Sequence, residues 1–97
     1  MIRHCVMFQW NDGLSDDTKQ AIAAALDHLS TAMPGIVAYN HGPDIGVNDG
    51  NFDYAVTADF VSKDAYLHYR DLPLHLEIIT TLIRPNIKGR SAVQLEV

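Results

Sequence analysis

Hydrophobic and polar positions along the chain change their period several times, and each change marks the border of a predicted element. From Ile2 to Trp10 the side chains alternate between two faces, which is typical of a strand. Ser15 is a good N-cap residue and begins a helical repeat of apolar residues that reaches Met33. Pro34-Gly35 ends this repeat, so we expect one long helix after the first strand.

The rest of the chain follows the same rules with shorter segments. Gly, Asn and Asp dominate residues 44–53, which predicts an exposed loop. Around this loop the pattern predicts strands at 36–41 and 52–60, a helix capped by Ser62, a helical segment from Pro73 to Arg84, and a strand at 91–97. The order βαββαβ is the split pattern of a ferredoxin-like α+β fold, with a four-stranded antiparallel sheet and both helices on one face. We expect residues 1–97 to form a single domain.

The two faces of the expected sheet predict a homodimer. The alternation places these apolar residues toward the helices: Ile2, Val6, Phe8, Val56, Phe60, Val93 and Leu95. The opposite face then carries Cys5, Met7, Ala55 and Thr57 near its middle, which is too apolar to leave in water. A second copy of the sheet would cover it, so we expect two chains packed sheet against sheet through the open face.

Composition and charge exclude several kinds of partner. The net charge of −5 provides no basic stripe for neutralising phosphate, so we expect neither a nucleic-acid nor a membrane partner. No apolar run of membrane-spanning length and no signal-peptide pattern is present, which predicts a cytoplasmic protein. Cys5 is the only cysteine, and the acidic loop lacks the spacing of a calcium-binding EF-hand loop. We therefore expect no metal site.

The segment from Tyr69 to His75 carries the candidate chemistry. Pro73 suits the first position of a helix, which makes Leu72 the cap and places His75 in the first turn. The unsatisfied N–H groups of that turn disfavour an imidazolium, so His75 is expected to be neutral and able to accept a proton. Tyr69 can face it across the break and donate its hydroxyl proton. The alternative is that both residues only pack.

Several short sequence motifs along the chain together form a recognisable pattern. They are Ile2-Arg3-His4, Phe8-Gln9-Trp10, Met33-Pro34-Gly35, Phe52-Asp53-Tyr54, Ala65-Tyr66, Pro73-Leu74-His75 and Arg84-Pro85. In this order and at this spacing they resemble the stress-responsive dimeric α/β-barrel (Dabb) family over essentially the whole chain. The resemblance implies a dimer in which two four-stranded sheets form a barrel.

The resemblance also implies residue roles. Plant polyketide cyclases of this family close a linear polyketide by an aldol condensation, and their catalytic Tyr and His match Tyr69 and His75. Their pocket His on the first strand matches His4. The sequence departs from that pattern in two places, because the usual His-Pro is Leu72-Pro73 and a second pocket His is replaced by Tyr54.

Together these observations favour a cofactor-free reaction on a small hydrophobic or polyketide-like ligand. His75 would remove a proton between two carbonyl groups, while Tyr69 polarises the carbonyl oxygen. The expected pocket wall consists of His4, Val6, Phe8, Tyr54, Val56, Ile79 and Leu95. His4 is expected to bond Tyr54 or His75, or to line a wet pocket, whereas His28, His41 and His68 are expected to be solvated.

Two other functions remain open. One is a non-catalytic stress-response dimer or small-molecule binding protein, which a filled core would favour. The other is a cofactor-free monooxygenase or isomerase that acts on aromatic rings. An open cavity beside His75 would favour chemistry over a purely structural role.

Overall fold

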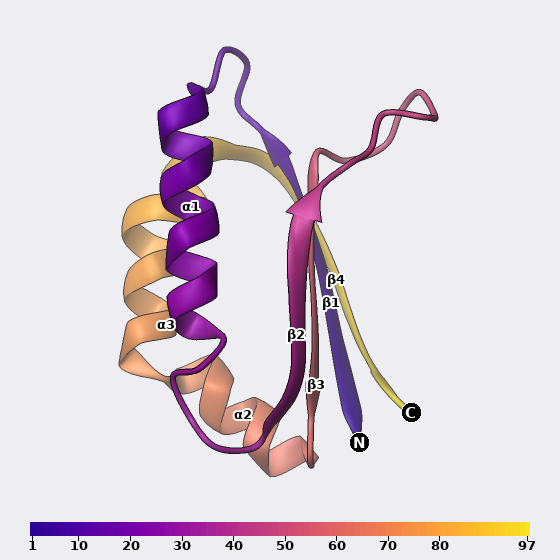
Figure 1. Ribbon diagram of the computed structural model, residues 1–97, viewed down its shortest axis with the longest axis vertical. Helices are drawn as coiled ribbons and strands as arrows, with labels where there is room; N and C mark the ends of the chain where they lie inside the picture. Colours follow the sequence, from indigo (N-terminus) through magenta and orange to yellow (C-terminus); the bar gives the residue numbers. More distant parts are fainter.

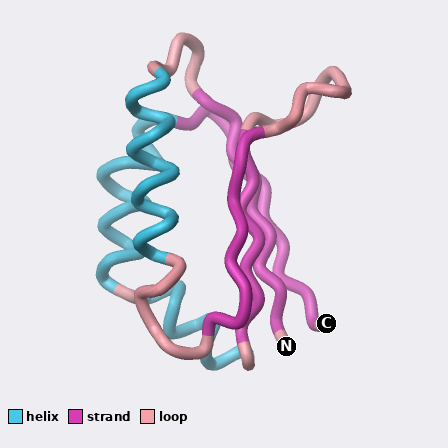
Figure 2. Tube along the Cα trace, in the orientation of Figure 1, coloured by secondary structure: helices cyan, strands magenta, loops and turns pink.

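The computed structural model describes every residue from 1 to 97, and its elements follow the order βαββααβ. They are β1 Ile2–Trp10, α1 Asp16–Leu29, β2 Ile36–Pro43, β3 Tyr54–Phe60, α2 Lys63–Asp71, α3 Pro73–Ile78, a π-helical turn η1 Ile79–Ile83, a 3₁₀ turn η2 Arg84–Asn86, and β4 Ile87–Glu96. The strands form one antiparallel sheet in the order β2-β3-β1-β4. All helices cover one face of this sheet (Figure 1 and Figure 2). The predicted ferredoxin-like fold is therefore confirmed.

Local chemistry explains where the helices begin and break. The Ser15 hydroxyl accepts from the Thr18 N–H at 3.1 Å, so a free amide of the first turn of α1 is satisfied. Ser62 caps α2 in the same way through the Ala65 N–H at 3.1 Å. Leu72 has an extended backbone between α2 and α3, because a residue before proline avoids the helical region. The break thus lies where the sequence predicts it.

The core fills the space between the helices and the inner face of the sheet. Phe60, Ile22 and Leu29 are its largest completely buried side chains. They join β3 and the inner face of α1, so burial of apolar area fixes the distance between the two layers. The long α1 runs alongside the sheet, while α2 and α3 follow it on the same side (Figure 1).

The last strand differs from the prediction in its start and in its facing. It begins at Ile87 rather than at Ser91, and its pairing with β1 places Leu95 opposite Arg3 and Val93 opposite Cys5. Directly paired residues share a face, so Val93 and Leu95 lie on the open face and not toward the helices. Sequence alternation alone does not say which side of a strand faces inward, and the more apolar side of this edge strand faces outward.

The open face is consequently more apolar than the sequence predicts. Met7 is 44% exposed, Leu95 is 43% exposed and Val93 is 57% exposed. These side chains lie on neighbouring strands on the side away from the helices.

The chain has no helix that combines the length and apolar character needed to cross a bilayer.

Candidate functional site

A cavity of about 330 Å³ lies between the sheet and the helices, beside the break between α2 and α3. Its wall consists of His4, Val6, Phe8, Leu26, Leu29, Tyr39, Val56, Tyr66, Tyr69, Arg70, His75, Leu76, Ile78, Ile79, Ile83, Arg84, Ile87 and Arg90. The volume is near the lower end of the range for small-molecule sites. A mostly apolar wall with a few polar groups is also typical of such sites.

Tyr69 and His75 meet across the helix break. Their ring centroids are 4.5 Å apart, and Tyr69 is only 2% exposed. The Nδ1 of His75 is 2.9 Å from the backbone carbonyl oxygen of Arg70. A carbonyl oxygen can only accept, so Nδ1 carries the proton and the Nε2 atom of the neutral ring has a free lone pair. This second nitrogen is the one that can accept a proton from a ligand.

The surroundings of His75 favour its neutral form. Burial lowers its pKa below the usual value for histidine, and the positive charge of Arg90 lowers it further. The bond to the Arg70 carbonyl and the nearby Asp71 carboxylate oppose this change in part. The imidazole is therefore uncharged at neutral pH, as a general base requires.

His4 presents the opposite tautomer to the same cavity. Its side chain is 5% exposed, and its Nδ1 accepts from the Gln94 amide nitrogen at 2.9 Å. Burial, His75 and Arg90 lower the pKa of His4 to about 4. The single ring proton consequently lies on Nε2, which is a donor. His4 thus bonds Gln94 rather than the predicted Tyr54 or His75.

The Nε2 atoms of His4 and His75 are both unbonded and not fully buried. Neither Nε2 atom makes a hydrogen bond within the chain. No buried side-chain nitrogen or oxygen of the chain lacks a partner, so these two atoms are not sealed in the packing. Both residues line the cavity, and together they have one unbonded acceptor and one unbonded donor nitrogen.

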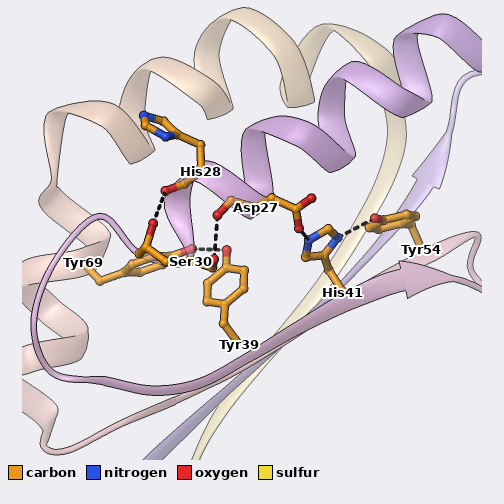
Figure 3. Close-up of polar contacts among 8 residues, drawn as sticks. Asp27, His28, Ser30, Tyr39, His41, Tyr54 and Tyr69 are labelled. Carbon is orange, nitrogen blue, oxygen red and sulfur yellow. Dashed lines mark hydrogen bonds and ion pairs between the residues drawn. The ribbon is translucent and has the colours of Figure 1, made fainter.

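A pair of tyrosines closes one side of the cavity. The hydroxyls of Tyr39 and Tyr69 lie 2.8 Å apart (Figure 3), and burial raises the pKa of each phenol above its usual value. Both phenols therefore keep their protons, and only one proton can lie between the two oxygens. The accepting phenol retains its own O–H for another partner. Tyr39 cannot be recognised as a site residue from the sequence, because only the pairing of β2 with β3 brings it to this position.

A second histidine–tyrosine pair lies outside the cavity. The His41 Nδ1 lies 2.6 Å from the Tyr54 hydroxyl, and the His41 Nε2 lies 2.6 Å from the Asp27 carboxylate (Figure 3). The carboxylate can only accept, so Nε2–H donates to Asp27, and in the neutral ring Nδ1 then accepts from the Tyr54 hydroxyl. The prediction that His41 is solvated is wrong, since its side chain is 12% exposed and both nitrogens are bonded.

Two of the predicted wall residues are absent from the cavity. Tyr54 lies on the helix-facing side but is not part of the cavity wall, and its hydroxyl bonds His41. Leu95 lies on the open face because of the register of β4, and Arg90 and Gln94 occupy the helix-facing side instead. The other predicted residues, His4, Val6, Phe8, Val56, Ile79, Tyr69 and His75, all line the cavity.

Comparison with known proteins gives a family and a set of structural neighbours. The family model described as "Stress responsive A/B Barrel Domain" matches residues 2–97. A dimeric ferredoxin-like protein of unknown function from Thermobifida fusca is 36% identical, with a TM-score of 0.92 over 99% of this chain and 90% of that chain. A Dabb family protein from Mesorhizobium loti is 17% identical, with a TM-score of 0.84 over 99% of this chain and 95% of that chain.

An enzyme is also among the structural neighbours. The hydroxynitrile lyase from Passiflora edulis is 21% identical, with a TM-score of 0.86 over 99% of this chain and 92% of that chain. At this identity the likeness concerns the fold. Among curated protein sequences, no relative matches the chain.

Proposed function

The chain belongs to the stress-responsive A/B barrel (Dabb) family, and we propose that its cavity catalyses cofactor-free proton abstraction from a small hydrophobic or polyketide-like carbonyl compound. An aldol-type cyclisation is the expected outcome of such a step. The observation that carries the proposal is that His75 lines the cavity and has an Nε2 atom that is unprotonated and makes no hydrogen bond within the chain.

The proposed step begins with the transfer of a proton from an acidic carbon to the Nε2 atom of His75. The ring becomes an imidazolium, and its Nδ1–H bond to the Arg70 carbonyl becomes a stronger, charge-assisted bond. The nearby Asp71 carboxylate stabilises the same positive charge. These contacts support a base that is neutral before the reaction and tolerates charge during it.

The negative charge that forms on the carbonyl oxygen also requires partners. If Tyr39 donates to the Tyr69 oxygen, the Tyr69 O–H is free to donate to the ligand. The Nε2–H of His4, whose ring centroid lies 6.3 Å from that of Tyr69, offers a second donor. Donors held in a mostly apolar cavity stabilise an enolate more strongly than water does, because little reorganisation is needed.

One structural neighbour is an enzyme. The Passiflora edulis protein is a hydroxynitrile lyase, so a protein of similar architecture acts as a lyase. A non-catalytic binding protein is the main alternative, and it would use the same apolar wall without needing the free His75 nitrogen.

The test is the loss of deuterium from the central carbon of 2-deuterated ethyl benzoylacetate, followed by NMR and corrected for spontaneous exchange. We expect His75→Gln to lower the protein-catalysed rate by about 100-fold or more. The matched control is His68→Gln, which removes an exposed histidine outside the cavity and should leave the rate unchanged. Binding of the ester without faster exchange in the wild-type protein would favour the binding function instead.

We also propose that the chain works as a homodimer joined through its open sheet face. The neighbours from Thermobifida fusca and Jannaschia are described as dimeric ferredoxin-like proteins. The exposed Met7, Val93 and Leu95 provide the apolar surface for such contact. Sedimentation should show a dimer that Val93→Glu dissociates, while Val61→Glu, at an equally exposed valine outside the strands, leaves it intact. A monomeric wild-type protein would contradict this proposal.

A further inference from the structure

The charge of the cavity differs from the charge of the chain. The sequence has a net charge of −5, yet the cavity wall includes three arginines and no aspartate or glutamate. The two wall histidines are neutral because their pKa values are lowered. A cation-bearing wall in an acidic protein indicates a preference for a negatively charged guest.

Ion pairing shows which of these arginines are free. Four of the basic side chains lie within ion-pair distance of a carboxylate: Arg3 with Asp59, Lys19 with Asp16, Arg70 with Asp71, and Lys88 with Asp12. The remaining three, Lys63, Arg84 and Arg90, have no carboxylate partner in the chain. Two of these three line the cavity.

The fold places both free arginines at the mouth of the cavity. Arg90 pairs with Phe8 in the β1–β4 ladder, so it lies on the helix-facing side of an edge strand. Arg84 follows directly after the π-helical turn, a local irregularity that is often found at functional sites. Both residues are exposed, whereas Val6 and Phe8 deeper in the wall are buried.

The resulting site is amphipathic. A guest with an apolar body would contact the buried aliphatic and aromatic wall, and an anionic group at its end would reach the guanidinium groups. The planar fork of arginine matches a carboxylate with two parallel N–H bonds, which a single ammonium cannot provide.

We propose that the cavity selects apolar molecules that carry a carboxylate, and that Arg90 and Arg84 bind this carboxylate at the mouth. The inference rests on the proposed function only in using the same cavity, and it adds the substrate class of a carbonyl compound that is also an acid. In this arrangement the carboxylate anchors the guest, and the carbon beside its carbonyl group lies nearer to His75.

The test compares two probes of the same shape and different charge. Calorimetric titration with 4-phenylbutanoate and 4-phenylbutanamide measures the preference for the carboxylate. We expect the acid to bind the wild-type protein about tenfold more tightly than the amide, and the Arg84→Gln/Arg90→Gln double variant to bind both alike. Lys63→Gln removes the third unpaired cation, which lies outside the cavity wall, and should retain the preference.

Each outcome decides the proposal. Equal affinity of the wild-type protein for both probes, no binding of either, or an undiminished preference in the double variant would overturn it. Equal loss of the preference in Lys63→Gln would also overturn it, because a general charge effect would then suffice. Exchange of deuterium from the uncharged ethyl benzoylacetate tests the base separately, so the function of His75 can stand even if the carboxylate preference fails.

Discussion

Two histidine–tyrosine pairs lie in this small fold, and they differ in what is left free. In the first, the rings of Tyr69 and His75 are 4.5 Å apart, and one nitrogen of His75 has no partner. In the second, both nitrogens of His41 are bonded, one to Tyr54 and one to Asp27, each at 2.6 Å. The first pair lines a cavity and the second does not.

The same two residue types therefore have a structural role in one pair and a potential chemical role in the other. The saturated His41 connects α1, β2 and β3 through its two bonds, so its contribution is to hold three elements together. His75 makes one hydrogen bond, to the backbone carbonyl of Arg70, and its second nitrogen remains available to a ligand. Of the two histidines, only His75 can accept a proton from a ligand without breaking a hydrogen bond of the fold.

The largest expected effect concerns the cavity side of the comparison, where His4 must stay neutral. Its pKa falls from 6.5 to about 4 on folding, so the unfolded chain binds more protons between these two values. The free energy of unfolding should therefore decrease by roughly 3 kcal/mol as the pH falls from 6.5 to 4, and it should be fully retained above that window.

Urea unfolding at several pH values checks this prediction. His4→Gln removes the titrating group, so its stability should change less across the same window. His28→Gln, at an exposed position outside the cavity, should keep the slope of the wild-type protein. A wild-type slope that His4→Gln leaves unchanged would show that other groups cause the acid sensitivity.

The next effect separates the two tyrosines. Tyr69→Phe removes the expected donor to the ligand oxygen and should lower the exchange rate of ethyl benzoylacetate by about tenfold or more. Tyr54→Phe removes only a hydroxyl that donates to His41 and should leave the rate unchanged. Stopped-exchange NMR measures both, and an equal loss in the two variants would mean that the phenols act through stability alone.

A smaller effect is expected on the stability of the second pair. His41→Gln loses the geometry of two short hydrogen bonds of a mostly buried side chain, so the free energy of unfolding should fall by about 1–2 kcal/mol. Urea unfolding measures the loss, and the deuterium exchange rate of the folded variant should equal that of the wild type. A catalytic loss at unchanged stability would reverse the assignment of the two histidines.

The smallest effect concerns Asp27, which is mostly exposed. Asp27→Asn keeps the shape of the side chain but removes the charge that accepts from His41, so unfolding should become easier by about 0.5 kcal/mol. Urea unfolding measures this difference. Asp64→Asn, at an acidic position without an ion pair, provides the control for a general charge effect.

Much of the fold can be predicted from the sequence because its signals are local. Serines before helical repeats and the proline after Leu72 act on their immediate neighbours, so the helix starts follow from chemistry a few residues long. The end of the first helix was predicted less well, because α1 ends at Leu29 and not at Met33. The π-helical turn at Ile79–Ile83 has no such local signal and was not predicted. The start of β4 at Ile87, four residues before the predicted start at Ser91, was not predicted either.

The site is predicted less completely, because its geometry depends on contacts between distant elements. The Tyr69–His75 pair comes from one short segment and could be found there, whereas Tyr39 and Arg90 reach the cavity only through strand pairing. The prediction that Leu95 faces the helices was wrong for a related reason. The apolar side of an edge strand is expected to face the core unless another surface covers it, and the sequence of one chain does not show such a surface. The tautomer of each histidine depends on its bonding partner, which the sequence does not show.

The central claim is that His75 is a neutral base that faces a guest while His41 is not. Side-chain ¹⁵N NMR of both rings at neutral pH, with and without ethyl benzoylacetate, tests it most directly. We expect the His75 ring to carry its proton on Nδ1, the signal of its Nε2 to change on addition of the ester, and the His41 signals to stay in place. A charged His75 ring, a proton on its Nε2, or a response confined to His41 would contradict the account.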